Sequence, residues 1–87
     1  MISIASAANT EIPCYLALIE LGFDVTKQQM GEREFWIAEK QGMKCVSDEG
    51  LCMLLGLAKL IEMRGYNWQA TDDEIAHFLK HFYKSVS

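Results

Sequence analysis

The sequence predicts a small α+β fold whose elements follow the order αβββαα. Three observations lead to this prediction. Apolar residues have helical spacing near the amino terminus, apolar and polar residues alternate between residues 23 and 46, and two further helical patterns lie between residues 47 and 86. We expect a small antiparallel sheet packed against an amino-terminal helix and a carboxy-terminal helical hairpin.

Length and composition restrict the class of protein. The chain has 87 residues, enough for one small domain that spans residues 1–87. Its apolar content of 51% supports a core, and with 23% charged residues a disordered chain is not expected. The net charge of -4 makes binding to nucleic acid unlikely, since phosphates attract basic surfaces, and a basic protein partner would match it better.

The first predicted element is a helix that begins at Thr10. Residues 1–9 form either a flexible tail or a short edge strand. Thr10 is a suitable N-cap, Glu11 complements the helix dipole, and Pro13 falls in the first turn, where its missing N–H costs nothing. Gly22 predicts the end of the helix.

Both sides of this helix are apolar. Helical spacing predicts one buried face, made of Ile12, Tyr15, Leu16 and Ile19. The opposite side carries Cys14, Leu18 and Leu21. The helix is therefore either covered on both sides or leaves an apolar strip exposed.

Three strands follow, and their pattern predicts a hairpin register. We expect strands at Phe23–Lys27, Glu34–Glu39 and Met43–Val46, with a loop at Gln28–Glu32. A two-residue turn at Gln41-Gly42 would place Glu39 opposite Lys44 and Ile37 opposite Val46.

Both faces of the hairpin are apolar in this register. One face holds Phe35, Ile37 and Val46, and the other holds Trp36, Ala38, Met43 and Cys45. Helices cover one face well, and the second face, which we place around Trp36, needs other cover. The amino-terminal segment, a subunit partner or a ligand would provide it, or strand ends and loops fold over it.

The carboxy-terminal half predicts two helices. Ser47 is expected to cap the first, with Asp48 and Glu49 in its first turn, and Arg64-Gly65 to end it. Its residues are apolar nearly all round, which is typical of a core helix. Thr71 and Glu74 form a capping box for the second helix. That helix carries an apolar stripe of Ile75, Phe78, Leu79, Phe82, Tyr83 and Val86, with His77, Lys80, His81 and Lys84 opposite.

The chain has three cysteines, Cys14, Cys45 and Cys52. Their number is odd and their spacing is not that of a disulfide scaffold, so we expect reduced, buried thiols and a cytoplasmic protein. We expect no export signal, because no basic and apolar segment precedes Ala5-Ser6-Ala7. No apolar run reaches the roughly 18 residues that span a bilayer.

Several residues are candidates for chemistry or binding. His77 and His81 have a spacing that lets two imidazoles share a metal ion, although two ligands on an open surface form a weak site and solvated residues are the simpler interpretation. Arg64, Tyr66 and Trp68 bring hot-spot residue types together in a connector, and Trp36 lies on the hairpin. The alternative for Trp68 is packing beneath the helices.

No phosphate loop, nucleophile elbow or catalytic triad pattern is present, so we expect a protein that is not an enzyme and needs no cofactor.

The carboxy-terminal pattern also resembles that of small uncharacterised bacterial α+β proteins. The resemblance rests on Leu54-Leu55-Gly56-Leu57, Arg64-Gly65, Trp68, Asp73-Glu74-Ile75 and Phe78-Leu79, together with the hairpin residues Trp36-Ile37-Ala38-Glu39-Lys40 and Gly42. It covers about the last 50 residues, implies a bacterial origin and the αβββαα order, and implies no activity.

Small size, acidity and surplus apolar surface favour a non-enzymatic protein-binding module of the bacterial cytoplasm, such as an immunity or antitoxin-like inhibitor. The alternatives are a regulatory or nucleic-acid-associated domain that uses Lys80, His81 and Lys84, and a homodimeric structural unit.

Overall fold

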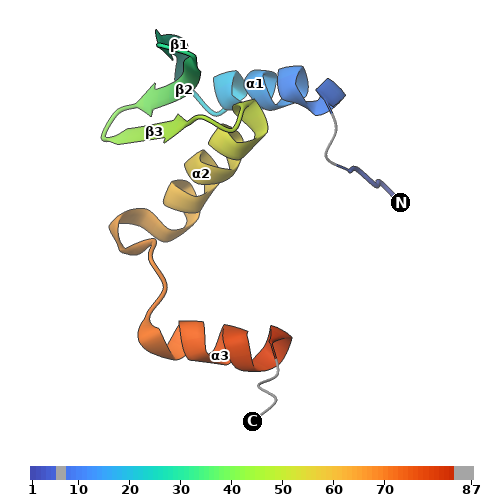
Figure 1. Ribbon diagram of the computed structural model, residues 1–87, viewed down its shortest axis with the longest axis vertical. Coiled ribbons are helices and arrows are strands. Elements are labelled where there is room, and N and C mark those ends of the chain that lie inside the picture. Colours follow the sequence, from blue (N-terminus) through green and yellow to red (C-terminus); the bar gives the residue numbers. More distant parts are fainter. Residues whose placement is uncertain (6–7, 84–87) are drawn as a thin grey trace.

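A computed structural model describes residues 1–5 and 8–83 of the chain and confirms the α+β class and the αβββαα order (Figure 1). The elements are the 3-10 turn η1 (Ala8–Thr10), α1 (Glu11–Glu20), β1 (Asp24–Met30), β2 (Arg33–Lys40), β3 (Met43–Ser47), α2 (Leu51–Arg64), the 3-10 turn η2 (Gly65–Asn67) and α3 (Asp72–Phe82). Residues 1–5 are exposed and lack regular secondary structure, so they form no edge strand.

The three strands form one antiparallel sheet in the order β1-β2-β3. The predicted hairpin register is confirmed, with Glu39 paired to Lys44 and Ile37 paired to Val46. The predicted loop at Gln28–Glu32 is wrong in part, because β1 extends to Met30, which pairs with Arg33. Only Gly31 and Glu32 remain as the turn, and the positive φ of Gly31, 63°, allows the chain to reverse this tightly.

The core lies between one face of the sheet and the two helices α1 and α2. Its buried residues are Leu18, Phe23, Ala38, Cys45, Leu51, Leu54 and Ala58. Trp36 and Met43 pack against this cluster, so the helices cover the face of the sheet that carries Trp36. The opposite face, with Phe35, Ile37 and Val46, is the less covered one, and the prediction that placed the unprotected face around Trp36 is wrong.

α1 ends in a Schellman motif. Gly22, with φ 92°, donates its N–H to the carbonyl of Ile19, and Phe23 donates to the carbonyl of Leu18. The side chains of Leu18 and Phe23 are both in the core, so the turn that ends the helix also directs the chain into β1 beneath it.

The buried face of α1 is the opposite of the one predicted. Leu18 is fully buried, and Cys14 and Leu21 pack against the core. Of the four residues expected to be buried, Ile12 is 70% exposed and Leu16 is 53% exposed, while Tyr15 and Ile19 are also accessible. The helix is thus covered on one side and leaves an apolar strip exposed.

Lys40 connects the end of β2 to both helices. Its ammonium donates to the carbonyl of Leu21 at the carboxy end of α1 (2.7 Å) and to Glu62 of α2 (3.2 Å), and it lies 5.2 Å from the centre of the Phe23 ring. The hydrogen bond from Lys40 is the main cause that lowers the pKa of the Glu62 carboxyl. A second hydrogen bond, from Lys59 at 3.3 Å, lowers this pKa further. A cation at this position also complements the dipole of α1.

The two carboxy-terminal helices have different surroundings. α2 packs on the sheet and on α1, whereas α3 lies apart from the sheet, joined to α2 by the connector (Figure 1). The capping box of Thr71 and Glu74 is confirmed. The apolar stripe of α3 is exposed. Its predicted member Val86, and Lys84 on the opposite side, lie outside the described residues. None of the helices within residues 1–5 and 8–83 is long and apolar enough to cross a membrane.

Candidate functional site

The four predicted binding residues lie at two separate places. Trp36 is at one end of the β2–β3 pair, opposite Ser47, whereas Tyr66 and Trp68 line a cleft at the other end, beside Met43. About four strand residues, or roughly 13 Å, separate these ends. The structure therefore groups Arg64, Tyr66 and Trp68 with one another and leaves Trp36 in a different site.

Trp36 borders an acidic cleft of about 510 Å³. The residues that line it are Glu11, Glu32, Arg33, Glu34, Trp36, Asp48, Gly50 and Leu51. Four carboxylates thus surround a half-buried indole, and Arg33 is the one cation among the lining residues.

Three of these carboxylates already have partners. Asp48 forms an ion pair with Arg33, and Glu34 forms one with Lys27 at 3.4 Å. The ammonium of Lys27 also lies 5.6 Å from the centre of the Trp36 ring, a cation–π contact. The carboxylate of Glu11 is directed to the backbone of α2, so Glu32 is the carboxylate of the cleft with the fewest contacts.

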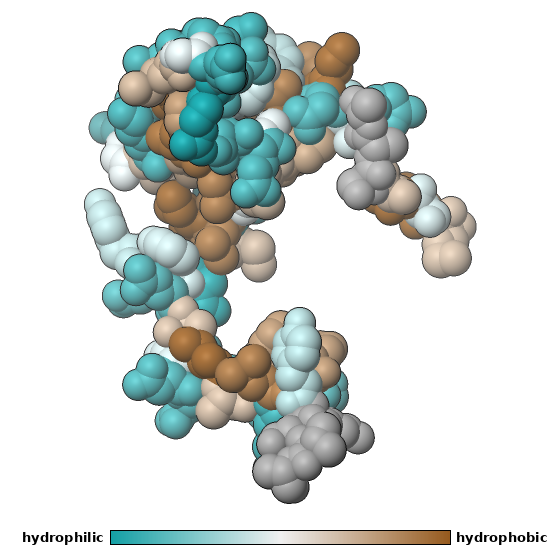
Figure 2. Space-filling model, viewed as in Figure 1, coloured by the Kyte–Doolittle hydropathy of each residue, from teal (hydrophilic) through white to brown (hydrophobic). Residues whose placement is uncertain are grey.

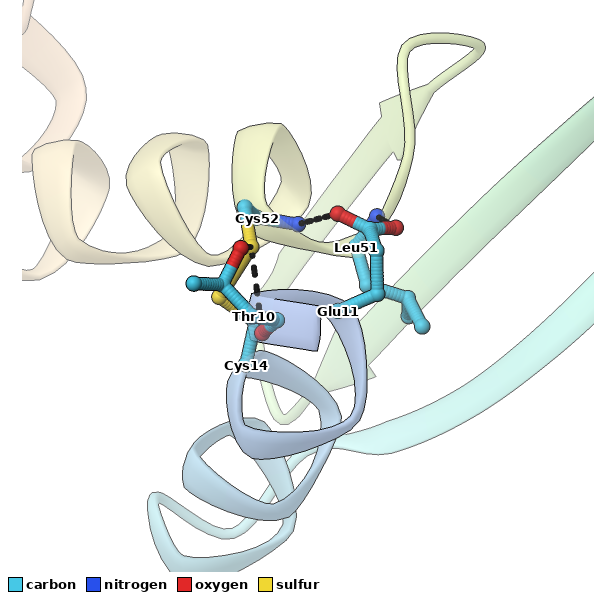
Figure 3. Close-up of a disulfide and its surroundings, with 5 residues drawn as sticks. All are labelled: Thr10, Glu11, Cys14, Leu51 and Cys52. Carbon is cyan, nitrogen blue, oxygen red and sulfur yellow. Dashed lines mark hydrogen bonds between the residues drawn. A yellow bond between two sulfur atoms is a disulfide. The ribbon is translucent and has the colours of Figure 1, made fainter. Parts of the chain in front are cut away.

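One wall of the cleft is the junction of α1 and α2, shown in Figure 3. Glu11 accepts hydrogen bonds from the first two amides of α2, that of Leu51 at 2.7 Å and that of Cys52 at 3.2 Å. A carboxylate at this position satisfies N–H groups that the helix itself cannot, and it complements the helix dipole. Glu11 of one helix therefore caps another helix.

This arrangement corrects two predicted caps. Ser47 does not cap α2: it is a buried residue of β3 whose hydroxyl accepts from the amide of Glu49, and Gly50 occupies the N-cap position. Thr10 is at the N-cap of α1, but its side chain makes no capping hydrogen bond. Its carbonyl oxygen and its hydroxyl oxygen each lie 3.3 Å from Sγ of Cys52.

A disulfide joins Cys14 to Cys52 at the same junction (Figure 3). The prediction of reduced thiols is therefore wrong for these two residues. Cys45 is free and buried in the core, and burial raises the pKa of its thiol. A buried thiol with a raised pKa is a poor nucleophile, as expected for a structural residue.

The second site is at the connector between α2 and α3. Arg64 donates from Nε to the carbonyl of Trp68 at 2.9 Å and from Nη2 to Glu74 at 3.4 Å. The backbone hydrogen bond from Thr71 lowers the pKa of the Glu74 carboxyl, and the charge of Arg64 lowers it further. Tyr66 is 96% exposed and Trp68 is 44% exposed, so neither packs fully beneath the helices.

Two adjacent clefts lie beside this connector, with volumes of about 450 and 230 Å³. Lys44, Ile61 and Trp68 line both. The other lining residues are Gln41, Gly42, Met43, Gly65 and Tyr66 in the larger cleft, and Cys45, Val46, Leu57 and Leu60 in the smaller one.

His77 and His81 lie on the exposed surface of α3 with their rings stacked and 6.4 Å between centroids. Among residues 1–5 and 8–83, no three histidine, cysteine or acidic side chains come together in a way that could hold a metal ion.

Sequence reasoning did not identify Glu11, Glu32 and Arg33 as site residues. Glu11 and Asp48 were each assigned to a local helix end, and Glu32 to a loop. The sequence signal for this cleft was Trp36, with Glu34 and Glu32 only two and four residues before it, whereas Glu11 joins the cleft only through the packing of α1 against the start of α2.

Comparison of the chain with protein-family models, with curated proteins and with solved structures finds no match.

Proposed function

We propose that this protein is a non-enzymatic binding module that holds a basic segment of another protein in the acidic cleft beside Trp36. The observation that supports the proposal is the composition of that cleft, in which four carboxylates and one guanidinium surround a half-buried indole. Lysine and arginine side chains are the groups that such a surface attracts, because carboxylates pair with their charge and the indole face stabilises a cation.

The chain itself provides an example of this recognition. Lys27 lies over the ring of Trp36 and pairs with Glu34 at the edge of the cleft. A lysine or arginine from a partner would make the same two kinds of contact with Trp36 and Glu32. Exposed ion pairs are each worth only about 0–1 kcal/mol, so several cations of one segment are needed for useful affinity.

The acidic character of the whole chain adds long-range attraction for a basic partner. A net charge of -4 on 87 residues speeds the encounter with an oppositely charged surface, and salt weakens this effect. Small acidic proteins that cover a basic surface are suited to inhibition, so we propose the immunity or antitoxin-like class, in keeping with the bacterial resemblance of the sequence.

The compartment forms part of the proposal. A cytoplasmic location was expected from reduced thiols, and the disulfide between Cys14 and Cys52 removes that basis. Disulfides persist in oxidising compartments such as a bacterial periplasm. We therefore propose that the partner is met in an oxidising compartment, with the cytoplasm as the alternative.

A fluorescence titration tests the cleft. The variant Trp68→Phe leaves Trp36 as the only tryptophan, and a tetra-arginine peptide serves as the probe, with tetra-glutamate as its negative control. We expect saturable changes in Trp36 emission with tetra-arginine alone. The pair Glu32→Gln and Glu34→Gln should weaken binding about fivefold, taking about 0.5 kcal/mol per lost charge.

The matched control removes two charges elsewhere. Glu20→Gln with Glu39→Gln changes the net charge by the same amount at exposed positions that do not line the cleft. Equal weakening by the control pair and the cleft pair would show that the peptide responds to net charge alone, and the proposed site would then be refuted.

A further inference from the structure

The helix α3 exposes a continuous apolar stripe. The exposed fractions of its members run from 45% for Ile75 to 68% for Tyr83, with Phe78, Leu79 and Phe82 between them. These side chains touch mainly one another: the rings of Phe78 and Phe82 are 4.9 Å apart, and those of Phe78 and Tyr83 are 6.2 Å apart. A contiguous apolar patch of this kind on a protein surface is often an interaction site.

An apolar groove lies on the same molecule. We call it the α2 groove and define it by Met43, Leu57, Leu60, Ile61 and Trp68, which line the two clefts beside the connector. A cavity of about 150 Å³ holds one benzene-sized ring. Clefts of about 450 and 230 Å³ therefore have room for aromatic side chains such as those of Phe78 and Phe82. Figure 2 shows hydrophobic side chains of α2 and α3 on the two sides of one open space.

In the structure, α3 begins outside the groove of its own chain. Arg64, the last residue of α2, donates hydrogen bonds to the carbonyl of Trp68 and to the carboxylate of Glu74. Trp68 itself lines the groove, so the chain leaves the groove there and α3 begins outside it. The capping box of Thr71 and Glu74 then fixes where the helix starts.

We propose that two copies of this chain form a symmetric dimer by exchanging α3, so that the apolar stripe of each α3 fills the α2 groove of the other copy. One exchange covers both the apolar stripe of α3 and the α2 groove, and the two-fold axis repeats it. This inference concerns surfaces remote from the acidic cleft at Trp36 and does not depend on the proposed function.

The area available is sufficient for a stable dimer. An aromatic side chain buries roughly 150–250 Å², and aliphatic ones somewhat less, so the exposed halves of the five stripe residues amount to about 500 Å². The groove loses a similar area, and the symmetric repeat brings the total to about 2,000 Å². Specific protein interfaces bury about 1,200–2,000 Å².

Charge complements the apolar match. Lys44 lines both clefts of the groove and forms no ion pair within residues 1–5 and 8–83. The first turn of α3 presents Asp72 and Asp73, which likewise have no ion-pair partner in the described part of the chain. An incoming α3 therefore brings acidic side chains to a groove that has an unpaired lysine at its rim.

Sedimentation velocity over a range of concentrations tests the dimer. We expect the wild type to dissociate reversibly on dilution. Phe78→Glu, on the stripe, and Leu60→Glu, in the groove, should each raise the dimer dissociation constant about a thousandfold, because a hot spot is worth about thirtyfold and symmetry counts it twice. The matched controls His77→Glu, on the polar side of α3, and Met63→Glu, exposed on α2 outside the groove, should change it by less than about threefold.

Mixing the two defective variants identifies the exchange. The Leu60→Glu chain keeps an intact α3, and the Phe78→Glu chain keeps an intact groove, so an equimolar mixture retains one of the two docked helices. We take Phe78 to dock against Leu60, so both substitutions in the second contact cost no more than one, and we expect a heterodimer about thirtyfold tighter than either variant alone. Circular dichroism of each variant establishes that it is folded.

Three outcomes would overturn the proposal. A wild type that is monomeric at every concentration shows that α3 is free or closes on its own chain. A dimer that survives both substitutions uses another surface, such as the open face of the sheet. Variants that lose dimerisation but show no recovery on mixing exclude reciprocal exchange.

Discussion

The capping of α2 by Glu11 predicts a large effect for a small change at a half-buried position. Glu11→Ala removes both acceptors from the amides of Leu51 and Cys52. Hydrogen bonds to a charged group contribute about 1.5–3 kcal/mol each, and the freed amides recover part of this by binding water. We expect the free energy of unfolding to fall by about 2 kcal/mol. Glu11→Gln keeps an acceptor without the charge and should lower it by about 1 kcal/mol.

Gly50 allows the same interaction to be measured in a second way. Its backbone has φ 102° and ψ -179°, a region that costs other residues about 1–3 kcal/mol. A Cβ added there would lie 2.7 Å from Oε1 of Glu11 and would displace the carboxylate. Gly50→Ala should therefore lower the free energy of unfolding by about 4 kcal/mol, half from backbone strain and half from the lost cap.

The double variant separates these two contributions. Each single substitution removes the cap, so the double variant Glu11→Ala with Gly50→Ala loses it only once. Its free energy of unfolding should therefore fall by about 4 kcal/mol, and not by the sum of the two single effects, about 6 kcal/mol. The coupling of about 2 kcal/mol is then the contribution of the Glu11 cap.

These free energies are measured by urea denaturation, followed by circular dichroism, with the disulfide intact. The comparison requires that the variants have the same m-value, the slope of the unfolding free energy against urea concentration. Glu20→Ala, an exposed position at the other end of α1, is the control and should lie within about 0.5 kcal/mol of wild type. If Glu11→Ala behaved like Glu20→Ala, or the two substitutions were additive, the cap would not stabilise the junction.

Two further predictions concern other parts of the molecule. The disulfide between Cys14 and Cys52 spans 38 residues, and reducing it should lower the free energy of unfolding by up to about 4 kcal/mol, measured by urea denaturation with and without reductant. The pKa of Glu74 is lower in the folded protein than in the unfolded chain, where it is about 4.3. The stabilisation of α3 by the Glu74 carboxylate is therefore fully present above about pH 4.3 and is lost as the pH falls through the lower folded pKa. The amide resonance of Thr71 should therefore stay constant from neutral pH to about pH 4.3 and shift below it, and Glu74→Gln should abolish that shift.

The features that were predicted correctly from the sequence depend on residues close together along the chain. A glycine turn fixed the register of the β2–β3 hairpin, Gly22 ended α1, and Thr71 with Glu74 began α3. Each of these follows from backbone geometry within a few residues, so no knowledge of the packing was needed.

The features that were missed depend on contacts distant in sequence. Both sides of α1 are apolar, so periodicity alone does not choose between the side of Leu18 and the side of Leu16. Only the sheet and α2 decide which side is buried. The pairing of Cys14 with Cys52 and the capping of Leu51 by Glu11 join residues about 40 positions apart, and they exist because α1 crosses the start of α2.

α3 shows a different limit of sequence reasoning. Its apolar stripe was predicted correctly for the described residues. The stripe is exposed in the structure, and about 500 Å² of apolar surface is costly in water. A helical pattern, however, identifies an apolar face without specifying the chain that covers it. The predicted helical hairpin placed α3 against its own chain, but in the structure α3 lies apart from the sheet and begins beyond the contacts of Arg64 with Trp68 and Glu74. An exposed apolar stripe and an apolar groove that do not meet within one chain therefore favour a second copy of the chain as the partner of α3.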